Sequence, residues 1–347
     1  MARSPWLVVR RELNPWQRSL LIGMAFILPL ATWCAVSYVP WIWHPLVLVT
    51  QPGESDFLTT DMLIDRQSFL EENAKLAAAK QAVATGTPSN PIFLPAPHKV
   101  LIALYTSFKT PPLRRGEPWL HESLLHSIEV IAIGFSIAAV VGVPLGILCG
   151  SFRAVAHLFE PVIDFIRYMP APAFGALMVA MLGIDDGPKI AIIFIATFFT
   201  TVLVVAKTAR MVDLSMLEAA QTLGASNKRL LTRVIVPAIL PDLYNDLRIL
   251  LGSAWTALIV AELIGASSGI SYFINQQGKY RNYDRVFAGI IIIGLIGLCT
   301  DQILAFIGRF LFPWRGTTNG RFATSIWTTA TWPVRMTAMP FTRRKSP

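Results

Sequence analysis

Long apolar segments constrain this chain more than any other feature of its sequence. Hydrophobic residues make up 54% of the 347 positions and charged residues only 15%, an excess typical of proteins that cross a membrane several times. Inside a bilayer each helix satisfies its own backbone hydrogen bonds, so we expect helices rather than open strands. The sequence therefore predicts an all-α membrane protein with about six transmembrane helices. The apolar segments are residues 20–39, 124–150, 158–184, 190–206, 243–266 and 286–312.

The charged residues predict how these helices are oriented. The net charge is +9, and cytosolic loops of membrane proteins carry an excess of Lys and Arg. Basic residues gather before the first apolar segment, within 207–233 and after Phe312, whereas the loop 183–189 carries two acids and one lysine. Both termini are therefore predicted to lie in the cytosol. The basic loop 279–285 is the exception, because the same topology places it outside.

This topology divides the chain into successive parts. Residues 1–19 form a cytosolic segment, and 20–39 form the first transmembrane helix rather than a signal peptide, since no small-residue cleavage site follows. Residues 40–120 hold an extracytoplasmic insertion, which we predict to be helical from the apolar spacing in its middle, Asp56 to Ala84, and a pre-core helix. The insertion either contacts a binding protein or is simply solvated. The core covers 121–312, and a cytosolic basic tail covers 313–347.

Several functional classes find no support in the residues. No nucleophile stands near a base, and the three cysteines, Cys34, Cys149 and Cys299, lie singly in apolar runs without the spacing of a metal site. We therefore predict neither a catalytic residue nor a metal on this chain. A basic chain can also bind nucleic acid, but no basic helix or aromatic-basic module supports that interpretation.

A short polar stretch between two apolar segments carries the most specific motif. Residues 213–233 contain Glu218-Ala219-Ala220, and Gly224 follows after three further residues. Nine residues then precede Val234-Ile235-Val236-Pro237. Glu218 near a helix start suits the positive end of the helix dipole, and Gly224 can end a helix in the left-handed conformation. We also expect Met216, Leu217, Ala220 and Leu223 to form one apolar face.

This stretch resembles the EAA loop of ABC importer membrane subunits, with Val234 and Val236 in place of Ile and Leu. In that family the loop folds as a short coupling helix in a groove of the ATP-hydrolysing subunit. The alternative is an ordinary cytosolic loop helix between two spans. The resemblance implies that contact with the ATPase subunit is made by Glu218, Ala219, Ala220, Leu223, Gly224 and Pro237.

A second resemblance narrows the family. Phe93-Leu94-Pro95-Ala96-Pro97, ahead of the second span, is similar to the branch that handles nitrate, sulfonates, taurine or bicarbonate, and the likeness extends over 93–312. It implies the type I ABC importer permease fold in a bacterial inner membrane and a small anion as substrate. It also implies lipid and three kinds of protein partner: ABC ATPase subunits, a second permease copy that makes a homodimer, and an extracytoplasmic binding protein.

No G-x-x-x-x-G-K-[ST] loop occurs in the sequence, so ATP and Mg are expected on the ATPase partner. The chain itself is then neither an enzyme nor the carrier of a cofactor. Two other classes remain as alternatives. A secondary, ion-coupled transporter needs no ATPase and predicts internal repeats, which we do not find. A non-transporting scaffold does not need the motif at 213–233.

Charged residues within apolar segments are candidates for the translocation path. Arg248, Trp255 and Glu262 follow one another at intervals of seven, so they share one helix face. Arg248 is the natural partner of an anion, and Arg167 lies in the broken segment 158–184. We predict these four residues to line the path. In the structural alternative, Arg248 reaches to the membrane interface and Glu262 forms a pair within the bundle.

Overall fold

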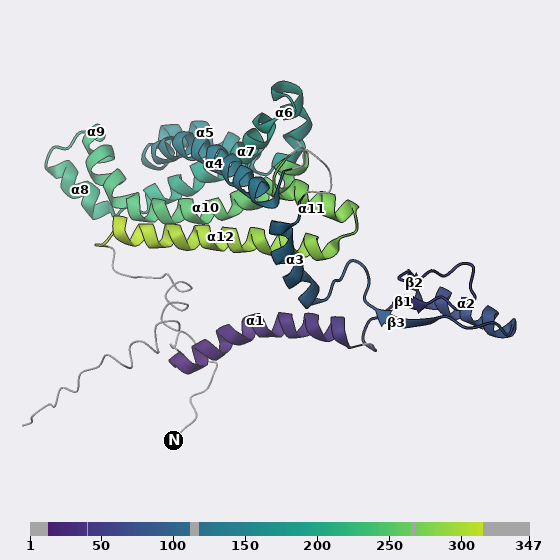
Figure 1. Cartoon of the computed structure of the whole chain (residues 1–347). Coiled ribbons are helices and arrows are strands. Elements are labelled where there is room, and N and C mark those ends of the chain that lie inside the picture. The colour runs from purple at the N-terminus through teal and green to yellow at the C-terminus, as the bar shows by residue number, and fades with distance from the viewer. Residues whose placement is uncertain (1–12, 40, 112–117, 265–267, 315–347) are drawn as a thin grey trace, which may run out of the picture. The chain divides into compact units, whose positions relative to one another are not determined.

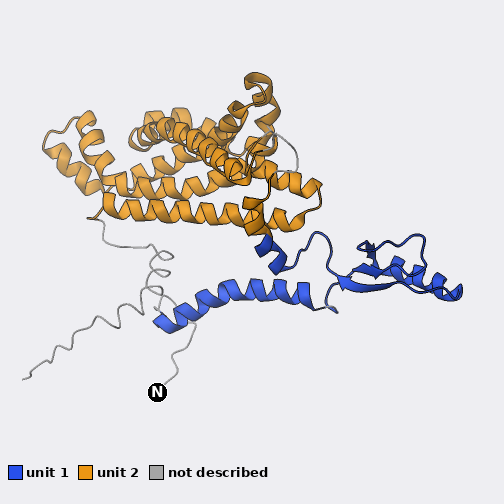
Figure 2. Ribbon diagram, viewed as in Figure 1, with its two compact units in different colours: residues 1–102, 320–347 blue, residues 103–319 orange. Residues whose placement is uncertain are grey.

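The computed structural model describes residues 13–39, 41–111, 118–264 and 268–314. Most of the predicted N-terminal segment and nearly all of the predicted basic tail therefore lie outside the described residues. The chain forms two compact units (Figure 2), one comprising residues 1–102 with the last part of the tail and the other comprising 103–319.

The first unit begins with the predicted first transmembrane helix. Helix α1 (Pro15–Tyr38) starts earlier than expected, because Pro15 fits the first turn and Asn14 N donates to Gln17 Oε1 at 3.2 Å. Its apolar side chains, Phe26 and Ile27 among them, are exposed in this chain. Such a surface is expected to face lipid.

The insertion contains a helix within the stretch Asp56 to Ala84, as predicted, but also a small sheet that was not predicted. Strands β1 (Leu46–Gln51), β2 (Leu63–Asp65) and β3 (Thr85–Ser89) pair antiparallel in the order β2-β1-β3, and only α2 (Arg66–Ala78) is helical. The missed signal is the short apolar run Leu46-Val47-Leu48-Val49 with its β-branched valines, a composition that favours a strand. Its buried core consists of Val47, Val49, Leu58, Ile64, Phe69 and Ala84.

The predicted turn ahead of the core is attached to α1. Trp33 Nε1 donates to the carbonyl oxygen of Pro95 at 3.1 Å, and the Tyr38 hydroxyl lies 2.6 Å from His98 Nδ1. Helix α3 (Pro97–Lys109) then follows and crosses the boundary between the two units. These contacts hold the start of α3 against the C-terminal part of α1.

Within the second unit, α4 (Leu120–Ser151) packs closely along α7 (Asp186–Arg210). Small residues on α4 make this approach possible, as is usual between membrane helices. A Cβ atom at Gly146 would lie 2.7 Å from Val205 Cβ, and one at Gly150 would lie 2.5 Å from Ala209 Cβ. Gly134 and Gly142 meet α7 in the same way, at Ile193 and Thr201. The glycine spacing therefore fixes the pairing of these two helices.

The predicted broken segment is sharply bent. Helix α5 (Arg153–Arg167) leads through the short turn η1 (Ala171–Phe174) into α6 (Gly175–Leu182), and the pair is bent by 87°. Among the described residues, 5 helices are long and apolar enough to cross a membrane, or 6 if the bent pair counts as one span. The prediction of about six spans is thus confirmed.

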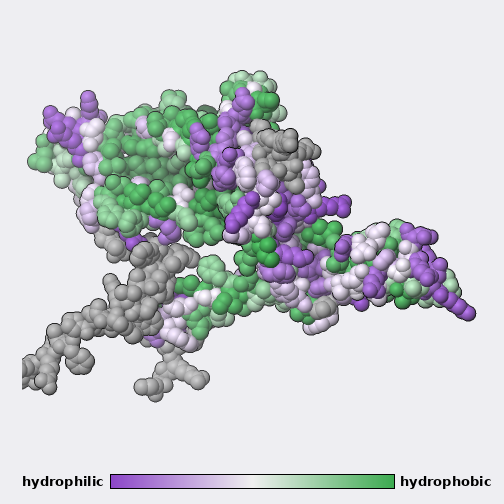
Figure 3. Space-filling view, viewed as in Figure 1, coloured by the Kyte–Doolittle hydropathy of each residue, from purple (hydrophilic) through white to green (hydrophobic). Residues whose placement is uncertain are grey.

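The remaining elements complete the second unit (Figure 1). They are α8 (Leu214–Thr222), α9 (Asn227–Leu230), the π-helical turn η2 (Leu231–Ile235), α10 (Val236–Ile264), α11 (Ile270–Lys279) and α12 (Tyr283–Leu311). Helices α8 and α9 lie at one end of this unit and α11 at the other. Figure 3 shows an apolar middle between more hydrophilic ends, the surface expected of a membrane-spanning bundle.

Candidate functional site

Helix α8 contains the predicted coupling motif, and local interactions determine both of its ends. At the start, the Asp213 side chain accepts a hydrogen bond from Ser215 N at 3.0 Å, a cap that the sequence analysis missed. At the end, Gly224 has φ +78°, and its N–H donates to Gln221 O at 2.9 Å. Ala225 N donates to Ala220 O at 3.0 Å. These two bonds form a Schellman motif, so Gly224 ends the helix as expected.

The surface of α8 is almost entirely free of contacts within this chain. None of its residues is buried, and Met216 and Leu223 are 50% and 88% exposed. The prediction of a single apolar face was wrong for Leu217, which packs toward Ile235 and the core of the chain's own bundle. Successive helical residues are turned by about 100°, so Leu217 cannot share the face of Met216 and Leu223. Helix α8 therefore presents an outward apolar surface, which is typical of a docking element.

The other predicted coupling residues lie around this surface. Glu218 and Ala219 are exposed, and Ala220 is partly buried. Pro237 is the second residue of α10 and is exposed. Since α9, η2 and α10 run on as one helix over Asn227–Ile264, Pro237 removes a helical N–H donor just after the π-helical turn η2. Such a turn is a local irregularity that is frequent at functional sites. An open hollow of about 580 Å³ beside Leu214 separates part of α8 from the end of α4.

Arg248 forms an ion pair that the sequence analysis did not predict. Its Nε donates to Asp301 Oδ1 at 2.5 Å and its Nη2 to Oδ2 at 3.4 Å, which links α10 to α12. A paired guanidinium has its charge neutralised and two of its donors occupied. Arg248 is therefore less available to an anion than its position in the sequence indicated.

Trp255 and Glu262 point into the bundle. Trp255 is buried, and its Nε1 has no hydrogen-bond partner among the described residues. Glu262 is completely buried and accepts hydrogen bonds from the Ser127 hydroxyl and, at 2.8 Å, from Ser271 N. Ser127 Oγ in turn accepts from Ile270 N at 2.9 Å. The carboxylate thus connects α10 to α4 and α11, which favours the structural interpretation of Glu262.

Arg167 lies beside a groove at the bend between α5 and α6. Its Nε is 2.8 Å from Asp164 Oδ1, and its guanidinium lies over the Tyr168 ring at 4.6 Å. The groove has a volume of about 470 Å³, and its wall includes the polar side chains of Ser253 and Thr256 from α10. Both are polar residues three apart in an apolar helix, a signal that the sequence analysis overlooked. Arg248 and Glu262 do not line this groove.

A buried cation at the end opposite α8 was also missed. Lys189 is fully buried, and its Nζ donates to Asp186 Oδ1 and Ser268 Oγ, each at 2.8 Å. His126 Nε2 lies 2.9 Å from the same two oxygens. The predicted outside loop 183–189 is shorter than expected, because Asp186 and Lys189 form the first turn of α7. Because burial requires a charge to be paired, this cluster joins α7 to α4 and to the segment before α11.

Removing one partner of the Arg248–Asp301 pair is expected to destabilise the bundle. Arg248→Met or Asp301→Leu alone leaves a partly buried charge without its partner and costs about 2 kcal/mol. The double variant removes both charges and should cost less than the sum of the two. Thermal unfolding in detergent measures this coupling, and strictly additive losses contradict it. If the double variant regains stability but not uptake, Arg248 has a role in the path besides the pair.

Comparison with known proteins identifies the family. Residues 142–312 match the family described as binding-protein-dependent transport system inner membrane component. The chain is 34% identical to a probable ABC transporter permease protein of Brucella abortus (strain 2308) over 229 residues, which are 66% of this chain and 89% of the relative. The chain belongs to this family of ABC transporter permeases. The permease is also 34% identical to the taurine transport system permease protein TauC of Escherichia coli (strain K12) over 234 residues, 67% of the permease and 84% of TauC.

Further comparisons agree with this assignment. Other relatives are named as permeases for aliphatic sulfonates, nitrate and bicarbonate. An inward-facing structure of the MetNI methionine ABC transporter matches with a TM-score of 0.50 and 16% identity, over 57% of the permease and 98% of that chain. This likeness shows the fold. The predicted permease fold is therefore confirmed, and the permease is a multi-pass inner-membrane protein rather than a secondary transporter or a scaffold.

Proposed function

We propose that this permease forms the path through which an ATP-driven importer takes up a small anion. The observation that carries the proposal is the exposed apolar surface of α8, between two transmembrane helices and bounded by the Gly224 motif. The names of the relatives, for taurine, aliphatic sulfonates, nitrate and bicarbonate, support a small anion as the substrate.

In this proposal α8 is the contact to an ABC ATPase subunit. Met216 and Leu223 enter a groove on that subunit, and the ATPase alone holds ATP and Mg. Two copies of the permease form a homodimer, so closure of two ATPase subunits brings two α8 helices together. The closed ATPases thus stabilise one arrangement of the bundles over the other, which is what any ligand-driven switch requires.

The proposed contact with the ATPase subunit also implies how the permease is oriented in the membrane. If α8 faces the cytosol, both termini are cytosolic, and the opposite end of the bundle receives the anion from an extracytoplasmic binding protein. The groove beside Arg167, with Ser253 and Thr256 in its wall, is then a section of the path within the membrane. Arg248 and Glu262 stabilise the helices of the bundle through the contacts described above, and Trp255 does so as part of its apolar core.

The test is the ATPase activity of the complex purified through this chain, together with its binding protein. Taurine, nitrate and bicarbonate are added separately. Stimulation by one of these anions is the expected result and identifies the substrate. Purification without any ATPase subunit overturns the proposal. An ATPase that co-purifies but responds to none of the three anions contradicts the proposed substrate class.

A further inference from the structure

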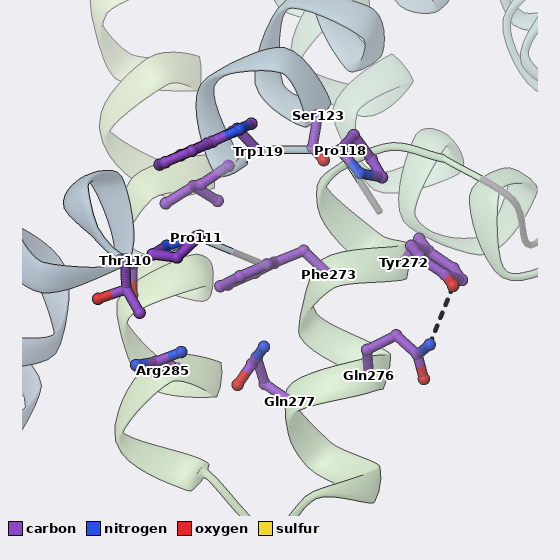
Figure 4. A pocket seen from close by; sticks show the side chains of 12 residues that line it. Thr110, Pro111, Pro118, Trp119, Ser123, Tyr272, Phe273, Gln276, Gln277 and Arg285 are labelled. Carbon is purple, nitrogen blue, oxygen red and sulfur yellow. Dashed lines mark hydrogen bonds between the residues drawn. The ribbon is translucent and has the colours of Figure 1, made fainter. Parts of the chain in front are cut away.

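A small cavity lies at the end of the second unit opposite α8. Its wall comes from the end of α3, the start of α4, α11 and the first turn of α12 (Figure 4), and its volume is about 30 Å³. A cavity of this size has room for roughly two water molecules. The other end of α4 lies beside α8, so about 48 Å of helix separates the cavity from the coupling motif.

Two buried hydroxyl groups in the wall of the cavity lack partners. Ser107 and Ser123 are 4% and 1% exposed, and neither Oγ has a hydrogen-bond partner among the described residues. Buried polar groups are almost always satisfied, because an unmade hydrogen bond is costly away from water. Both serines belong to the wall of this cavity, so a small shift of either side chain would let its hydroxyl donate to an acceptor atom of a ligand there.

The other polar groups of the cavity favour an anion. Arg285 supplies a positive charge, and none of the lining residues is acidic. Gln277 Oε1 accepts a hydrogen bond from Asn282 Nδ2 at 3.1 Å, which leaves the Gln277 NH₂ group as a donor. In Figure 4, Arg285 and Gln277 approach the Phe273 ring from one side while Trp119 lies on the other. The aromatic walls lower the local polarity and strengthen hydrogen bonds to a bound ion.

We propose that this cavity binds the oxyanion group of a small solute, such as a nitrate ion or a sulfonate group, as it enters the permease. The assignment rests on the proposed function for its orientation and for the class of anion. It also explains the one exception to the charge pattern, since the loop with Lys279, Arg281 and Arg285 is basic although the topology places it outside. Positive charge around a mouth raises the local concentration of anions.

A thiol placed in the cavity tests the proposal without any transport. Thr110→Cys lines the cavity, whereas Thr106→Cys, one turn earlier on α3, does not. Both are made in the full-length chain with Cys34, Cys149 and Cys299 replaced by serine. The initial rates of labelling by an anionic sulfonatoethyl thiosulfonate and its cationic trimethylammonium counterpart are compared. We expect the anionic reagent to be favoured about tenfold at Thr110→Cys relative to Thr106→Cys, because Arg285 acts on the two reagents with opposite sign.

Charge variants and competing anions decide the outcome. Arg285→Gln should remove the preference and Arg285→Lys should retain it, while added nitrate or taurine should slow labelling only at Thr110→Cys. Equal preference at both positions, or a preference unchanged by Arg285→Gln, overturns the proposal. Labelling requires neither ATP nor a partner. If the cavity favours the anionic reagent but no ATPase subunit co-purifies with the permease, the anion site is kept and the import function is rejected. If an anion stimulates the co-purified ATPase but the cavity shows no preference, only the anion site is rejected.

Discussion

Replacing Gly224 with valine is expected to abolish most ATP-driven uptake while the permease still inserts into the membrane. Gly224 has φ +78°, where a β-branched residue is strongly disfavoured. The left-handed conformation costs about 1–2 kcal/mol for an ordinary residue. This cost lowers the fraction of molecules that form the Schellman motif roughly tenfold, and coupling falls with it. Without this motif the last turn of α8 changes direction, and Leu223 no longer faces the ATPase subunit. Uptake into cells and the amount of permease in the membrane are measured together.

Gly224→Asn is the matched control. Asparagine tolerates the left-handed conformation far better than valine does, and a Cβ atom at this position would meet nothing within 4 Å. The effect of valine is therefore conformational rather than steric, and Gly224→Asn should keep most of the uptake. Wild-type uptake by Gly224→Val would contradict the assignment of α8 as the coupling helix.

Gly269→Ala is expected to prevent stable folding of the junction between α10 and α11. Gly269 has φ +103°, and a Cβ atom there would lie 2.1 Å from Glu262 Oε1. The carboxylate cannot easily retreat, because Ser127 and Ser271 hold it inside the bundle. Depriving the buried Glu262 carboxyl group of these hydrogen bonds costs about 1–3 kcal/mol, and the positive φ disfavours alanine as well. Most of the variant should therefore aggregate on extraction, as size-exclusion chromatography and thermal unfolding in detergent will measure.

Gly252→Ala provides the comparison for this variant. Gly252 lies within α10, has no positive φ, and a Cβ atom there would meet nothing within 4 Å. Alanine also favours a helix more than glycine does, so this variant should be at least as stable as the wild type. If Gly269→Ala unfolds at the same temperature as Gly252→Ala, the buried position of Glu262 does not stabilise the permease.

The elements predicted correctly from the sequence are those with local causes. A long apolar segment has to span the bilayer wherever its neighbours lie, which is why α1, α7 and α12 were predicted. Gly224 ends α8 through hydrogen bonds to residues at most five positions away. The small sheet was not predicted, because it has no such local cause. Strand β1 pairs with strands far along the chain, and β3 carries little strand signal of its own.

The sequence by itself determined the membrane class, the approximate number of spans and the C-terminal end of α8, since each depends on composition or on neighbouring residues. Only the tertiary structure decided what covers each helix face. The seven-residue spacing of Arg248, Trp255 and Glu262 placed them on one face, but Asp301 and Ser127, which pair with the two charged members, are 53 and 135 residues away. A helical period shows which residues share a face and not which residues pack against it, because those contacts form only when the bundle assembles.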